Sequence, residues 1–195
     1  MSVNGNMSVN DDKTKNYSVT AGREDGGNSV SATAFVSGYR DTPDPTKLNA
    51  PPYNVAGVSL NAAHENGHAV GLKAQHIPTF GNQVTASSNV NVIKIDNHRF
   101  DVNAHSTANF PKNSPNFMTH GAGAEYMFKE KVGANASVSH TPMFKQTDYS
   151  VGGSLNLHKT PTSSLDFNVG ANKTVTPFHN GNWNKGGGFI FTKKF

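Results

Sequence analysis

Apolar and polar residues alternate one by one along much of this 195-residue chain, and this period-two pattern constrains the fold more than any other feature. The stretch "VSLNAAHENGHAVGLKA" (residues 58–74) is an example. Successive side chains of a β-strand point to opposite faces, so such alternation gives a strand one apolar and one polar face. No segment shows the sustained 3.6-residue period, with caps, that a helix requires. The sequence therefore predicts an all-β chain.

The centre of that stretch, "HENGH" (residues 64–68), matches the H-E-x-x-H motif of zinc metalloproteases. In that motif two histidines bind zinc from one face of a helix, and the glutamate activates water. Asn66 and Gly67 are poor helix formers and together are a strong turn signal. If residues 65–67 form a three-residue loop, Leu60 faces Leu72, and the apolar residues of both flanks share one face. We therefore predict a hairpin here, with a zinc metalloprotease as a remote alternative.

Composition predicts a thin core and limits the classes of function. Only 34% of the residues are hydrophobic and 15% are charged, and the net charge is +4. The basic residues are scattered, with no run of five. This favours weak attraction to anionic surfaces over a nucleic-acid cleft. The chain carries neither a phosphate-binding glycine loop nor a nucleophile elbow, so we expect no enzymatic activity, no catalytic residues, no cofactor and no metal site.

Two further features concern cellular location. The chain contains no cysteine, so disulfides give no information on its compartment. It has no apolar run near 18 residues, and its start, "MSVNGNMSVN", lacks the apolar core of a signal peptide. We expect a signal peptide to be absent from this chain, which would then be the mature form of a secreted protein.

The second two-thirds of the chain repeats itself. "HIPTF" returns as "HTPMF", "FDVNA" as "LDFNV" and "YMFKEK" as "FIFTKK", each about 64 residues later and in the same order. Residues 68–131 and 132–195 are therefore predicted to be two copies of one unit. Residues 1–67 stand outside the repeat, with a Pro-rich loop at 41–52. The polar segment before about Val30 is predicted to be disordered, or at most an edge strand.

Each copy can be paired into hairpins. We predict turns at residues 97–98, 129–131 and 160–162. The predicted apolar cross-strand pairs are Ile95–Phe100, Ile93–Val102, Phe128–Val132, Tyr126–Ala134, Leu155–Phe167 and Leu157–Leu165. The predicted fold is an antiparallel meander of about ten strands, curled or closed into a flattened barrel or a two-layer sheet to protect its edges.

Four long stretches then indicate a family. "HIPTFGNQVTASSNVNV", "PNFMTHGAGAEYMFKEKVGANASVSHT", "DYSVGGSLNLHKTPTSSLDFNVGANK" and the ending "GGGFIFTKKF" resemble the attacins, glycine-rich antibacterial proteins of insect haemolymph. The resemblance covers about residues 55–195 in collinear order, and the internal repeat corresponds to the two tandem glycine-rich domains of that family.

The resemblance implies a secreted protein of innate immunity that acts on Gram-negative bacteria. Attacins bind lipopolysaccharide, raise the permeability of the outer membrane and disturb the production of its proteins. The implied partners are the bacterial outer membrane and lipopolysaccharide. Neither a dedicated protein partner nor a nucleic acid is implied, and no cofactor or enzymatic activity comes with the family.

Lipopolysaccharide offers phosphates and acyl chains, so its binder needs cations beside apolar surface. The C-terminal stretch "NWNKGGGFIFTKKF" combines both, and the loop at residues 129–131 adds lysines. The candidate contact residues are Lys129, Lys131, Trp183, Lys185, Phe189, Phe191, Lys193 and Lys194.

Other interpretations remain open. The phenylalanines could be core residues and the lysines solvated strand ends. The nine histidines are expected at polar turn and strand-end positions, with a pH-dependent cationic surface as the alternative. An outer-membrane-type β-barrel would also have amphipathic strands and a terminal phenylalanine, although the many Asn, Lys and His residues argue against a lipid-facing band.

Overall fold

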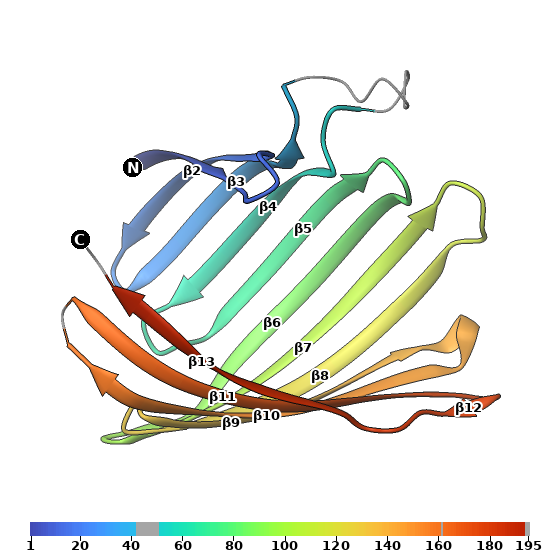
Figure 1. Cartoon of the computed structure of the whole chain (residues 1–195). Helices are drawn as coiled ribbons and strands as arrows, with labels where there is room; N and C mark the ends of the chain where they lie inside the picture. Colours follow the sequence, from blue (N-terminus) through green and yellow to red (C-terminus); the bar gives the residue numbers. More distant parts are fainter. Residues whose placement is uncertain (42–50, 161, 194–195) are drawn as a thin grey trace. The chain divides into compact units, whose positions relative to one another are not determined.

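The computed structural model describes residues 1–41, 51–160 and 162–193. These residues form thirteen β-strands and one short 3-10 turn, η1 (Pro142–Phe144), without an α-helix (Figure 1). The strands are β1 (Ser2–Val9), β2 (Lys15–Asp25), β3 (Asn28–Tyr39), β4 (Val55–His64), β5 (Ala69–Ile77), β6 (Gly81–Ile95), β7 (His98–Pro111), β8 (Phe117–Phe128), β9 (Val132–Thr141), β10 (Gln146–Lys159), β11 (Ser163–Thr176), β12 (His179–Asn180) and β13 (Asn184–Lys193).

The strands follow one another as a meander. Each strand from β1 to β12 lies beside the next one in the sequence, and β13 pairs with β11, the strand that β12 also pairs with. Short turns link most neighbours, which is why the pairing is antiparallel. The predicted all-β antiparallel meander is thus confirmed, and over the described residues the sheet is not closed.

Spatial contacts divide the chain into two units. Unit 1 comprises residues 1–88 and 106–118, and unit 2 comprises residues 89–105 and 119–195. Strands β6, β7 and β8 contribute residues to both. This division does not test the predicted copies 68–131 and 132–195, which stay a prediction.

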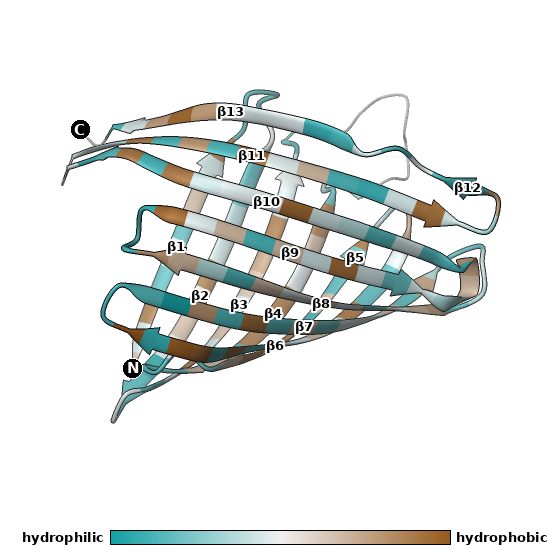
Figure 2. Cartoon of the chain, turned by 90° about the horizontal axis from the view of Figure 1, so that it is seen from below, coloured by the Kyte–Doolittle hydropathy of each residue, from teal (hydrophilic) through white to brown (hydrophobic). Residues whose placement is uncertain are grey.

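In unit 1 the alternation places apolar residues on one face of the strands. Across β4 and β5, Leu60 pairs with Leu72, Val58 with Ala74 and Ala62 with Val70, as the sequence predicts. On the opposite face, threonines of neighbouring strands meet: Oγ1 of Thr20 and Oγ1 of Thr33 are 2.9 Å apart. Figure 2 shows the resulting change from hydrophilic to hydrophobic along individual strands.

The "HENGH" segment is the turn between β4 and β5. The N–H of His64 donates to the carbonyl of His68 at 2.8 Å, and the N–H of Gly67 donates to the carbonyl of His64 at the same distance. Gly67 has φ 91, which favours glycine. The predicted hairpin is confirmed, and the helix on which the metalloprotease motif depends does not form here.

No hydrophobic residue is buried anywhere in the described ranges. Leu60 and Val70 of unit 1 are 55% and 60% exposed. The few buried residues are polar, such as Thr14, Asn109 and Thr141, or are glycines. Neither unit encloses an apolar interior of its own within the described residues. The strands are therefore held together mainly by backbone hydrogen bonds and by side-chain ladders on the polar face.

The N-terminal region corrects one prediction. The segment before Val30 forms β1 and β2, and only β1 is an edge strand; β2 is paired on both sides. The prediction of disorder is wrong for β2. Polar residues there complete hydrogen-bonded ladders instead of remaining solvated, and the Asn16 amide oxygen, for example, accepts from the Ser37 hydroxyl at 2.7 Å. Residues 42–50 of the predicted Pro-rich loop lie outside the described residues.

The turn and register predictions have mixed outcomes in unit 2. Residues 129–131 do form the turn that pairs Phe128 with Val132, with Lys129 and Glu130 at positive φ. Leu155 pairs with Phe167 as predicted. Leu157 does not pair with Leu165, because a β-bulge sets His158 opposite Leu165.

The turn between β6 and β7 lies one residue earlier than predicted, at residues 96–97, where Asp96 adopts φ 39. The Oγ1 atoms of Thr85 and Thr107 are 2.9 Å apart, so odd-numbered residues of β6 share a face with odd-numbered residues of β7, whereas the predicted pairs join odd to even positions. Asn91 bonds Asp101 on one face, so Ile93 shares that face while Val102 lies on the other, and the predicted Ile93–Val102 pair is wrong.

Candidate functional site

Strand β13 gathers several of the predicted contact residues on one face. Lys185, Phe189, Phe191 and Lys193 occupy alternate positions, and their partners on β11 are Ala171, Phe167, Leu165 and Ser163. Alternation along a regular strand keeps all four side chains on the same side of the sheet. These four candidate contact residues therefore share one face of β13.

The phenylalanines of β13 are surface residues. Phe189 and Phe191 are 68% and 63% exposed, and the ring of Phe189 lies 4.9 Å, centroid to centroid, from the ring of Phe167. The interpretation of these two residues as core is wrong, because more than half of the surface of each is exposed. They offer aromatic surface to anything that approaches this face.

A row of large apolar side chains crosses five strands of unit 2. Phe128 of β8 pairs with Val132 of β9, which pairs with Leu155 of β10. Leu155 in turn pairs with Phe167 of β11, which pairs with Phe189 of β13. Four inter-strand spacings make this row about 19 Å long. We call the side of unit 2 that carries it the apolar face, and the opposite side the polar face.

The lysines of the β8–β9 turn lie at one end of this row. Lys129 places its Nζ 5.2 Å from the centroid of the Phe128 ring, a cation–π contact. The backbone of Lys131 donates to the Phe128 carbonyl at 2.9 Å and accepts from the Asn156 N–H at 2.7 Å. The turn is thereby fixed to the strands, and both lysines are exposed.

The remaining predicted residues have less definite positions. Trp183 lies just before β13 and is 42% exposed. Lys194 lies outside the described residues. The structure thus brings Lys185, Phe189, Phe191 and Lys193 together on one strand face, and places Lys129 and Lys131 at the far end of the row that Phe189 completes.

The charges of strands β8 to β13 are unevenly distributed between the two faces. Register places three of the four lysines, Lys173, Lys185 and Lys193, on the apolar face, and Lys159, opposite Ser164, on the polar face. The carboxylates of these strands, Glu125, Asp148 and Asp166, all lie on the polar face. Lys173, which sequence reasoning missed, lies opposite Tyr149 of β10.

Comparison with known proteins identifies the family. A model described as "Attacin, C-terminal region" matches residues 78–195. The chain belongs to the attacin family. It is 43% identical to Attacin-E of Hyalophora cecropia over 99% of this chain and 80% of that protein. It is 39% identical to Attacin of Bombyx mori, over 98% and 87%. The match to Attacin-B of Hyalophora cecropia is 49% identical and covers 67% of this chain but 57% of that protein.

These matches confirm the resemblance that the sequence indicated. Attacins are antibacterial defence proteins of insects. No solved structure matches this chain. The family match spans β6 to β13 and includes every predicted contact residue.

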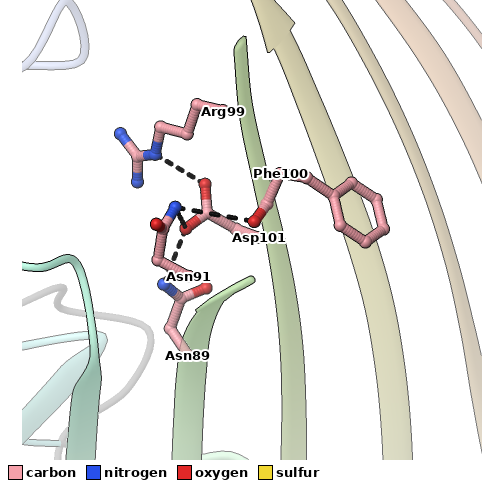
Figure 3. Close-up of polar contacts among 5 residues, drawn as sticks. All are labelled: Asn89, Asn91, Arg99, Phe100 and Asp101. Atoms are coloured by element: carbon pink, nitrogen blue, oxygen red, sulfur yellow. Dashed lines mark hydrogen bonds and ion pairs between the residues drawn. The ribbon is translucent and has the colours of Figure 1, made fainter. Parts of the chain in front are cut away.

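The polar face of this attacin contains one buried carboxylate, Asp101 of β7, which is 3% exposed (Figure 3). Its Oδ1 accepts hydrogen bonds from the side-chain amides of Asn91 at 3.0 Å and Asn89 at 3.3 Å. Its Oδ2 lies 2.6 Å from Nε of Arg99. Burial raises the pKa of Asp101, but the hydrogen bonds from Asn91, Arg99 and Asn89 and the charge of Arg99 outweigh it and hold the pKa below its usual value.

Two chemical features are absent from the part of the chain that the structure describes. Its residues include no cluster of three or more His, Asp or Glu side chains able to hold a metal ion. None of its helices has the length and apolar character to cross a membrane.

Proposed function

We propose that this chain is a secreted innate-immune protein that binds lipopolysaccharide on the outer membrane of Gram-negative bacteria through the apolar face of unit 2. Binding then raises the permeability of that membrane and disturbs the production of its proteins. The observation that carries the proposal is the division of charge: lysines accompany the exposed aromatic row, and the carboxylates of β8 to β13 lie on the other face.

The physical argument combines two weak effects. Lysine ammonium groups on the apolar face attract the phosphates of the outer leaflet, and the exposed rings of Phe189 and Phe191 enter the apolar layer beneath them. An exposed cation–anion contact contributes only about 1 kcal/mol. Binding therefore depends on several lysines acting together, and no single side chain is essential.

The first prediction tests the lysines of this face. A variant with Lys173→Glu, Lys185→Glu and Lys193→Glu should bind lipopolysaccharide at least about tenfold more weakly, because three attractive contacts become repulsive. The matched control carries Lys13→Glu, Lys112→Glu and Lys145→Glu, three exposed positions in turns, and has the same net charge. Binding, outer-membrane permeability and growth inhibition are measured for both variants.

Circular dichroism must show that the two variants keep the β-sheet spectrum of the unaltered protein. Binding should also weaken as salt rises, because screening acts over about 10 Å at 0.1 M. Equal binding by the two variants, or binding that ignores salt, would refute the proposal that this face carries the contact.

A further inference from the structure

The apolar face of unit 2 contains a groove of about 660 Å³. Its floor and sides come from Val151, Gly153, Val169, Ala171 and Gly187, and Lys185 lies at its margin. The groove is shallow and open to solvent, and its lining is almost wholly apolar.

Small residues create the groove. Next to the row that ends at Phe189, the paired residues are Ala134, Gly153, Val169 and Gly187. One further step along the strands they are Ala136, Val151, Ala171 and Lys185. The following step restores large residues, with Tyr149 beside Val138 and Lys173. The groove is thus a band of small side chains between two rows of larger ones.

Glycine at position 153 is not required by packing. A Cβ built there would meet the Gly133 carbonyl oxygen and a Val169 methyl group at 3.5 Å, which is ordinary van der Waals contact. Its φ is also outside the left-handed region that favours glycine. The missing side chain therefore leaves space on the apolar face without relieving a clash.

We propose that this groove binds an acyl chain of a phosphorylated lipid, with the phosphate held by Lys185 and Lys173. Charge complementarity supports this occupant. These two cations flank the groove at its β11 and β13 side, and the carboxylates of β8 to β13 all lie on the polar face. The inference rests on the proposed function, and it specifies that the groove takes the acyl chain of the lipid.

The polar face provides the contrast. A hollow of about 420 Å³ there includes Glu125, Asn135, Ser154 and Asn168 in its lining. An acidic and amide-lined hollow repels an anionic lipid and leaves its amides without partners if a hydrocarbon enters. Of these two hollows of unit 2, the groove on the apolar face is the one that suits an acyl chain of a phosphorylated lipid.

The test fills the groove without changing charge. Gly153→Leu places a side chain in it, and Gly188→Leu is the matched control on β13, where an added Cβ meets nothing within 4 Å and points to the polar face. The probe is monododecyl phosphate below its critical micelle concentration. The single tryptophan of the chain, Trp183, precedes β13 and serves as the fluorescence reporter.

We expect the unaltered protein to bind dodecyl phosphate, and to bind hexyl phosphate and inorganic phosphate much more weakly. Gly153→Leu should bind dodecyl phosphate about tenfold more weakly, while Gly188→Leu stays within about twofold. If Gly153→Leu does not keep the native circular dichroism spectrum, Ala171→Leu fills the same groove from β11 and replaces it.

Equal affinity of Gly153→Leu and the unaltered protein for dodecyl phosphate overturns the groove proposal. Equal affinity for inorganic phosphate and dodecyl phosphate overturns it as well, because the dodecyl group would then contribute nothing to binding. If the triple lysine variant loses lipopolysaccharide binding but Gly153→Leu does not weaken dodecyl phosphate binding, the proposed function stands and the groove proposal fails. If the unaltered protein binds dodecyl phosphate in the groove but does not bind lipopolysaccharide, the groove proposal stands and the proposed function fails.

Discussion

Asp101 shows how a residue can be buried in a sheet that has no apolar core. Its carboxylate is covered by the neighbouring side chains of Asn89, Asn91 and Arg99, each of which donates to it. A buried charge costs free energy unless it is paired and hydrogen-bonded, and here both conditions are met. The polar face of β6 and β7 is therefore locked by a network that forms only when the two strands are in register.

The residue-scale prediction concerns this network. Asp101→Asn should lower the free energy of unfolding by about 1.5–3 kcal/mol at pH 7, because charge-assisted hydrogen bonds to a buried group are lost. The exposed Arg23–Asp25 pair supplies the control, and Asp25→Asn should cost less than about 0.5 kcal/mol. Urea unfolding followed by circular dichroism measures both.

The same variant has a pH signature. The folded pKa of Asp101 lies below the ordinary value of 3.8, so its stabilising effect is fully present above that value and is lost as pH falls through the folded pKa. The difference in stability between the unaltered protein and Asp101→Asn should thus be constant above about pH 5 and shrink below pH 4. A difference that grows on acidification would contradict this assignment.

At the scale of the strand, a β-bulge interrupts the pairing of β10 with β11. Asn156 pairs with Asp166 and His158 pairs with Leu165, so Leu157 is the extra residue of a bulge. The bulge lets the end of β10 keep its contacts although its residue count does not match that of β11. It also separates the regular pairing around Val151 from the β10–β11 turn.

We predict that deletion of Leu157 leaves the stability of the fold nearly unchanged, whereas deletion of Val151 lowers it strongly. Removing Leu157 leaves Asn156 and His158 adjacent, as their partners on β11 already are, so the stability should change by less than about 1 kcal/mol. Removing Val151 shifts one part of the strand by a residue and can bring Asp148 to the apolar face, with a loss of more than about 3 kcal/mol.

Both deleted residues are comparably exposed apolar side chains, 50% for Leu157 and 44% for Val151, so loss of hydrophobic burial cannot explain a difference between them. The midpoint of urea unfolding reports the outcome. If the two deletions are equally harmful, the pairing of β10 with β11 is not the one described.

The sequence predicted those strands and turns whose local signals are unambiguous. Asn66-Gly67 indicated the β4–β5 turn, and the register of that hairpin followed from the alternation alone. The β6–β7 turn was misplaced by one residue because Asp96 and Asn97 both tolerate positive φ, and no local signal distinguishes the alternatives. Leu157 looks like any alternating leucine, so the bulge is visible only when both strands are paired.

The candidate site was predicted to a similar extent. Phe189, Phe191, Lys185 and Lys193 alternate within one strand, so their shared face could be read from the sequence. Lys173 was missed because the aromatic residue opposite it, Tyr149, belongs to another strand. The groove at Gly153 depends on small residues meeting across β9, β10, β11 and β13, and this information lies in the register.

At the scale of the whole chain, the described residues fold with little apolar burial. Backbone hydrogen bonds and polar ladders must offset the conformational entropy of ordering the strands. Unfolding then exposes little apolar surface that was not exposed before. We predict a heat capacity of unfolding clearly below the usual value of about 12–15 cal/mol/K per residue, measured by calorimetry.

The folded protein should also bind the dye ANS in dilute buffer while its far-UV circular dichroism shows β-structure, because the apolar faces are open to solvent. An ordinary heat capacity together with no ANS binding would mean that these faces are covered in solution. Sedimentation would then show whether a second copy of the chain covers them.

The separation of the two faces has an evolutionary consequence. In most proteins the side chains that bind a target compete with those that maintain the fold, and gains in activity are made at the expense of stability. In unit 2 the ladder around Asp101 and the Thr119–Thr141 hydroxyl pair lie on one side, and the aromatic row with its lysines lies on the other. Substitutions on the proposed contact side leave the ladders intact, so selection for a changed target surface can reshape that side without eroding the scaffold.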